Sequence, residues 1–73
     1  MMNKEDYLAL KEKFLNIYSS VPLPLRDQII AVGGKNNDEE LSWRACKVEI
    51  ENDGPSAESI LQQLMKIGVL KNG

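Results

Sequence analysis

The sequence predicts a small α+β domain, mostly helical, in the order helix–strand–strand–helix–helix. Apolar residues recur at helical spacing near both ends of the chain, and a β-branched apolar run followed by Gly33-Gly34 lies between them. The 73 residues fit a single domain covering positions 1–73, and no linker or repeat divides them. We expect the first and last helices to pack together over a short hairpin, with Trp43 near the centre.

A first helix is predicted from about residue 3 to 19. Asn3 is a good N-cap, and Glu5 and Asp6 place negative charge on the first turn, where the helix dipole favours it. The apolar stripe that follows consists of Tyr7, Leu10, Phe14 and Ile17. The stretch 21–24 ends the helix, because a residue before proline is disfavoured in the helical conformation.

The segment 29–32 is predicted to be a buried strand. Its sequence, Ile-Ile-Ala-Val, is apolar and mostly β-branched, and two glycines follow it. Residues 33–38 then form the turn, and residues 39–42 form a short antiparallel partner strand. The alternative for this segment is a two-turn helix framed by Pro24 and Gly33.

Residues 43–51 fit both a helix and a strand. Apolar and charged residues alternate along part of this segment, which is a strand pattern and would give an α-β-β-α order. Ser42 is a good N-cap, and we predict a helix on that basis. Such a helix would carry apolar residues on two sides, with Ala45 and Val48 opposite the face of Cys46. If residues 29–32 were helical as well, the domain would be all-α.

A last helix is predicted after the turn at residues 52–55. Ser56 is expected to be its N-cap, and Glu58 lies in its first turn. Gly68 stands where a left-handed residue ends a helix, and Val69 is expected to fold back onto the last turn. The apolar stripe of this helix consists of Ala57, Ile60, Leu61, Leu64 and Ile67.

Five features follow one another between residues 21 and 68. They are the Ile29-Ile30-Ala31-Val32 run, a Gly-rich turn, Ser42-Trp43, Glu49-Ile50-Glu51-Asn52, and a capped helix that contains Ile60-Leu61 and Leu64. This order resembles a family of small uncharacterised archaeal proteins of unknown function. The insert 36–39 makes the turn longer than the compact hairpin of that family. The resemblance implies no activity.

The composition argues against the common routes to catalysis and to structural metal binding. The chain has no histidine and one cysteine, Cys46, so it offers neither a Ser-His or Cys-His pair nor four zinc ligands. We therefore predict a protein that is not an enzyme and that uses no cofactor. Cys46 is expected to be a small buried apolar side chain.

Two short segments resemble phosphate and calcium loops but lack their defining residues. Gly33-Gly34-Lys35 is preceded by Ile29 where a P-loop has its first glycine, and no Ser or Thr follows the lysine. Residues 36–40 are rich in side-chain oxygen but lack the spacing and the distant glutamate of a calcium loop. A solvated turn is the interpretation of both segments.

We predict a soluble, cytoplasmic protein that does not bind a membrane. No apolar run approaches the roughly 18 to 20 residues of a membrane span. The first residues are charged and contain no apolar signal-peptide core.

Trp43 and several apolar residues of the predicted loops and tail are candidates for contact with a partner. A core this thin cannot easily cover them all, so some of them are expected to form a contact patch. These candidates are Trp43, Leu23, Leu25, Val69 and Leu70. For Trp43 a core position and an exposed hot spot are both open. The sequence thus predicts a non-catalytic protein-interaction or regulatory module that binds a protein partner or forms a homodimer.

The alternative function is that of a small nucleic-acid-associated protein. It would use a basic cluster of Arg26, Arg44 and Lys47. Acidic residues lie among these positions and the net charge is −2, which weakens any attraction to phosphate.

Overall fold

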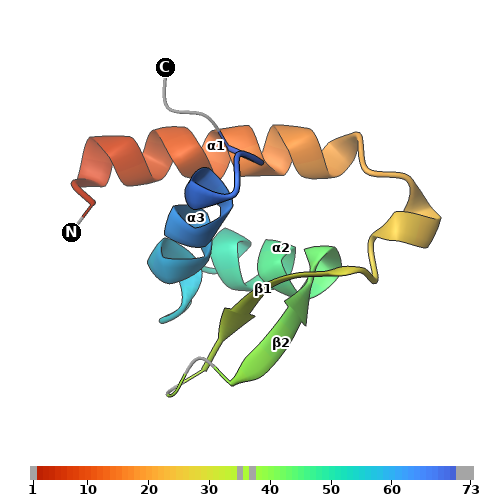
Figure 1. The fold of residues 1–73 in the computed structure, drawn as a ribbon. Helices are drawn as coiled ribbons and strands as arrows, with labels where there is room; N and C mark the ends of the chain where they lie inside the picture. The colour runs from red at the N-terminus through yellow and green to blue at the C-terminus, as the bar shows by residue number, and fades with distance from the viewer. Residues whose placement is uncertain (1, 35, 37, 71–73) are drawn as a thin grey trace.

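The computed structural model describes residues 2–34, 36 and 38–70. In this part of the chain the predicted order helix–strand–strand–helix–helix is confirmed, with a short 3-10 turn added before the first strand (Figure 1). The elements are α1 (Lys4–Ser19), η1 (Leu23–Leu25), β1 (Ile29–Gly33), β2 (Glu39–Ser42), α2 (Trp43–Glu51) and α3 (Ala57–Lys66). Lys35 and Asn37 of the predicted turn lie outside the described residues.

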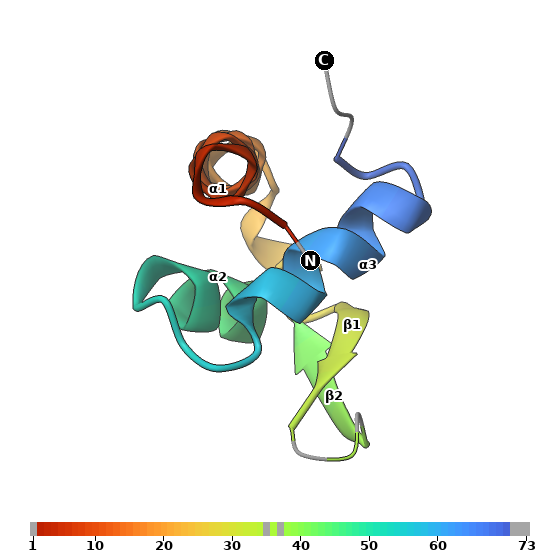
Figure 2. The same ribbon diagram turned by 90° about the vertical axis from the view of Figure 1, so that its left-hand side faces the viewer.

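The elements form three levels rather than the predicted pair of helices over a hairpin. α1 lies across α2 and α3 on one side, and the hairpin lies on their other side (Figures 1 and 2). The expectation that the first helix packs over the hairpin is therefore wrong. The apolar stripe of α1 is covered by α2 and α3 instead, because α2 is a helix whose buried face turns toward α1.

The core lies between the three helices and the inner face of the hairpin. Phe14 is fully buried, and its ring stacks on that of Trp43 at a centroid distance of 5.9 Å. Cys46 is fully buried beside it, as predicted, and burial raises the pKa of its thiol to about 12. The buried residues are Leu10, Phe14, Tyr18, Ala31, Cys46, Ile50, Ala57, Ile60, Leu61, Leu64 and Leu70.

Residues 43–51 are helical, so the strand alternative for this segment is wrong. The Ser42 Oγ accepts a hydrogen bond from the Ala45 N–H at 3.1 Å, which is the predicted cap. The helical turn places Cys46 and Ile50 together in the core and leaves Val48 52% exposed, whereas a strand would direct all three side chains to the same face. The helix predicted over residues 43–51 is therefore confirmed, together with its cap.

Of the two predicted ends of α3, the C-terminal end is confirmed and the N-terminal cap is wrong. Gly68 is left-handed, with φ of 86°, and the Val69 N–H donates to the Leu64 carbonyl at 2.9 Å, as the predicted C-terminal motif requires. Ser56, however, makes no side-chain cap on α3. Its Oγ instead accepts a hydrogen bond from the Gly34 N–H at 3.3 Å, and this bond ties the α2–α3 loop to the hairpin.

The same loop is tied to α1 by the carboxylate of Asp53. The Tyr7 hydroxyl donates to Asp53 Oδ1 at 2.6 Å, and Lys11 Nζ donates to the same oxygen at 2.8 Å. Burial and the bond to Asp53 raise the pKa of Tyr7 to about 12, while the bonds from Lys11 and Tyr7 lower that of Asp53. The backbone of Asp53 is in the left-handed region, with φ of 51°.

Candidate functional site: the groove between α2 and β2

The hairpin has two outer edges, and the β1 edge is closed by a side chain of α3. The Val32 N–H donates to Gln63 Oε1 at 3.0 Å, and Gln63 Nε2 donates to the Val32 carbonyl at 2.8 Å. Ser59 accepts a second bond from Nε2 at 3.2 Å, which orients the amide. The glutamine thus supplies the donor and the acceptor that a neighbouring strand would supply.

The edge of β2 is open at Glu40. The strands are antiparallel, with Val32 opposite Glu40. Because both backbone groups of Val32 point toward α3, the two residues form a non-hydrogen-bonded pair, and the Glu40 N–H and C=O point to the outer edge. Within residues 2–34, 36 and 38–70, no hydrogen bond to these two groups is present.

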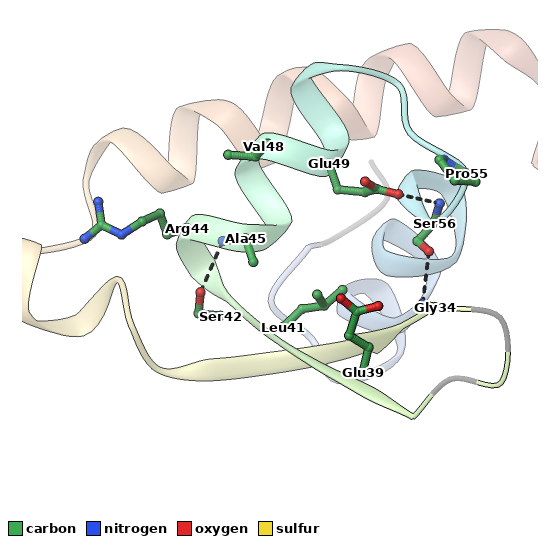
Figure 3. A pocket seen from close by; sticks show the side chains of 10 residues that line it. All are labelled: Gly34, Glu39, Leu41, Ser42, Arg44, Ala45, Val48, Glu49, Pro55 and Ser56. Carbon is green, nitrogen blue, oxygen red and sulfur yellow. Dashed lines mark hydrogen bonds between the residues drawn. The ribbon is translucent and has the colours of Figure 1, made fainter.

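A groove with a volume of about 550 Å³ runs between β2, α2 and the α2–α3 loop (Figure 3). Its apolar lining comes from Leu41 on β2, Ala45 and Val48 on α2, and Pro55 in the loop. Two carboxylates, Glu39 and Glu49, stand at its walls. A concave apolar surface with a few charged groups is the usual form of a binding site.

The groove exists because α2 has two apolar sides and only one of them is in the core. Cys46 and Ile50 are fully buried against α1 and α3. Ala45 is half-buried and Val48 is 52% exposed, and both face the groove. The sequence predicted apolar residues on two sides of this helix, and the structure covers only the first.

Hydrogen bonds fix the end of the groove that is formed by the α2–α3 loop. Glu49 Oε2 accepts a bond from the Ser56 N–H at 2.8 Å, and the Ser56 Oγ accepts the bond from Gly34 described above (Figure 3). These contacts join α2, the loop and the hairpin in one chain of bonds. The groove is therefore preformed, and an occupant does not have to order its walls.

The charge at the groove is negative. Glu39 and Glu49 form no ion pair with any described residue. The cation among the lining residues, Arg44, is paired through Nε to the Asp27 carboxylate at 3.3 Å. A positively charged group is therefore favoured beside the apolar floor.

The predicted basic cluster is brought together only in part. Arg44 and Lys47 lie one turn apart on α2, and the Arg44 N–H donates to the Arg26 carbonyl at 3.0 Å. The Arg26 guanidinium lies over the Tyr18 ring at 4.6 Å, and its Nε donates to a backbone carbonyl. Lys47 pairs with Glu51 at 3.1 Å. All three cations thus have partners within the fold.

The predicted contact residues lie in different environments, and none of them lines the groove. Leu23 and Leu25 are 66% and 42% exposed in η1. Trp43 is half-buried against the core, with its ring on Phe14. Val69 is also half-buried, and Leu70 is 1% exposed, so Leu70 offers no surface to a partner in this fold. The sequence did not predict the groove. The feature that could have indicated it is the second apolar side of α2, whose residues Ala45 and Val48 line the groove.

Neither a protein-family model, nor a curated protein, nor a solved structure matches this chain. The resemblance to small archaeal proteins therefore stays a prediction.

In the described part of the chain, no helix is long and apolar enough to cross a membrane. The same residues contain no group of three or more acidic or cysteine side chains that would hold a metal ion.

Proposed function

We propose that this chain is a non-catalytic protein-interaction module and that the groove between α2 and β2 is its binding surface. The observation that carries the proposal is the half-exposed Val48, which lines a preformed groove together with Leu41 and Ala45. An apolar side of a helix that the fold itself leaves uncovered is typical of a surface that a partner covers. A buried apolar anchor surrounded by polar groups is also typical of binding hot spots.

The charges at the groove specify the chemistry of the partner. Glu39 and Glu49 favour a polypeptide segment in which lysine or arginine flanks an apolar side chain. Such a segment would bury its apolar side chain on Ala45 and Val48 while its cations face the two carboxylates. The proposal therefore commits to a cationic segment of another protein.

A second copy of this chain fits the groove less well. Glu39 and Glu49 line it, and the net charge of the chain is −2. A two-fold pairing of β2 strands centred on Glu40 would set two Glu40 side chains opposite each other, which is unfavourable. The electrostatics thus favour a different partner over a homodimer at this surface.

The nucleic-acid alternative has less support. A phosphate-binding surface needs cations that are free to replace counterions. Arg44 and Lys47 are each paired with an acidic side chain, and Arg26 lies over Tyr18. No feature of the described residues favours nucleic acid over a cationic peptide.

Selection from a phage-displayed library of random 12-residue peptides tests the proposal. We expect enrichment of peptides that contain an apolar residue flanked by lysine or arginine. A synthetic peptide made from the enriched sequence should bind the Val48→Asp variant at least about tenfold more weakly, because a carboxylate replaces the apolar anchor. Isothermal titration calorimetry measures this difference.

Leu8→Asp is the matched control for this experiment. Leu8 lies on α1 and is 49% exposed, against 52% for Val48, and it does not line the groove. Its replacement should leave binding within about twofold. Equal losses in the two variants, or enriched peptides that are acidic, would contradict the proposed surface. Binding of a DNA or RNA oligonucleotide that weakens steeply with salt, in place of peptide binding, would support the alternative.

A further inference from the structure

The open edge of β2 and the groove adjoin each other, and together they indicate how a partner is held. We propose that the partner segment binds as an extended strand added to the outer edge of β2. This inference rests on the proposed function and deepens it, because it specifies the conformation of the bound segment. Strand addition is a common mode of peptide recognition, in which backbone bonds supply affinity and alternate side chains supply specificity.

The backbone of Glu40 supplies the first part of the argument. Its N–H and C=O point outward, as the bonding of Val32 to Gln63 requires. One residue of an added strand pairs with both groups. These are the groups that a third strand of the sheet would use.

The pleat of the sheet supplies the second part. Side chains on adjacent strands at the same level point to the same face. Leu41 lies opposite Ala31, which is buried, so Leu41 and Glu39 share the inner face of the hairpin. Every second side chain of an added strand would point to that inner face, where the groove lies (Figure 3). An apolar residue there would meet Leu41 and Val48.

A helical occupant fits less well. A helix satisfies its own backbone groups, so a helix lying over the β2 edge would remove water from the Glu40 N–H and C=O without replacing their hydrogen bonds. An extended segment pairs with these groups and covers the apolar floor at the same time. The edge of β1 offers no equivalent site, because Gln63 already occupies both backbone groups of Val32.

The test is a scan of backbone N-methylation along the peptide selected for binding to the groove. Methylation removes one N–H at a time and leaves the side chains unchanged. In a strand, alternate residues direct their N–H groups to β2 and to solvent. We expect affinity to fall at least about tenfold at alternate positions and to change less than about threefold at the intervening ones.

Hydrogen exchange by NMR adds a second measurement on the same complex. The Glu40 amide should exchange at least about tenfold more slowly in the presence of saturating peptide, while the Val32 amide, already bonded to Gln63, should change little. Peptide binding that still requires Val48 but shows no alternation and no Glu40 protection would overturn strand addition and leave the groove proposal standing. The absence of any peptide whose binding depends on Val48 would overturn both.

Discussion

The two edges of the hairpin differ in what the neighbouring helix does to them. α3 lies beside β1 and closes its edge, because Gln63 bonds to both backbone groups of Val32. α2 lies beside β2, but the side chains that it turns toward the groove, Ala45 and Val48, are short and apolar. The result is one closed edge and one open edge in a sheet of two strands.

This difference shows that proximity of a helix does not by itself protect a strand edge. At β1 the protection comes from a side chain that carries both a donor and an acceptor, the Gln63 amide, which bonds to both backbone groups of Val32. Apolar side chains beside an edge have the opposite effect. They leave the polar groups unpaired and add a surface that favours an apolar partner.

The largest expected effect comes from removing the packing that holds α3 at the closed edge. Leu64 follows Gln63 and is fully buried in the core. Leu64→Ala should lower the free energy of unfolding by about 2–5 kcal/mol, because it removes buried methyl groups and leaves a cavity. Urea denaturation followed by circular dichroism measures the loss. A variant with wild-type stability would contradict the described core.

A smaller loss is expected when the closed edge is opened directly. Gln63→Leu removes both bonds to Val32, and we expect a loss of about 1–3 kcal/mol, because the Val32 N–H and C=O are left unpaired. Gln62→Leu is the matched control, since Gln62 is exposed on the same helix and should change stability by less than about 0.5 kcal/mol. Equal effects of the two substitutions in the same urea titration would mean that the bonds to Val32 do not hold this edge.

On the open side, substitution should affect stability much less than binding. Val48 is half-exposed, so Val48→Asp should change the free energy of unfolding by no more than about 0.5 kcal/mol. Thermal unfolding of the free variant checks this expectation. A large loss would show that the second apolar side of α2 stabilises the fold, and the groove would then lose its interpretation as a partner surface.

The smallest effect concerns the loop that ends the groove, through the pH dependence of Asp53. Hydrogen bonds from Lys11 and Tyr7 lower its pKa below the ordinary value of 3.8. A lowered pKa means that its contribution is present above the ordinary value and is lost as the pH falls through the folded-state value. Asp53→Asn should therefore lower the melting temperature near neutral pH. The difference from wild type should shrink as the pH falls from about 5 to about 2. A difference that is the same at both ends of this range would show that the charge is not involved.

Local signals made most of the fold predictable. Asn3 and Ser42 are side-chain caps that act within three residues, and the β-branched run of β1 carries its own preference. Ser56 has the same local signal as Ser42, yet it bonds to Gly34 on the hairpin instead of capping α3. The choice between a local and a distant partner depends on tertiary placement, which one sequence does not reveal.

The site was less predictable than the fold for the same reason. Gln63 lies among helical residues and has the pattern of a solvent-facing position, and only its placement beside Val32 gives it a role. Ala45 and Val48 were recognised as a second apolar side of a helix. The pattern shows that such a side exists but not whether the fold covers it.

Amide hydrogen exchange of the free protein tests the central claim most directly. At neutral pH the Val32 amide should be protected, because it donates to Gln63, whereas the Glu40 amide should exchange within about tenfold of the rate of an unfolded peptide. This contrast should disappear in Gln63→Leu, in which the Val32 amide loses its acceptor. Equal protection of the two amides in the wild-type protein would contradict the distinction between a closed and an open edge.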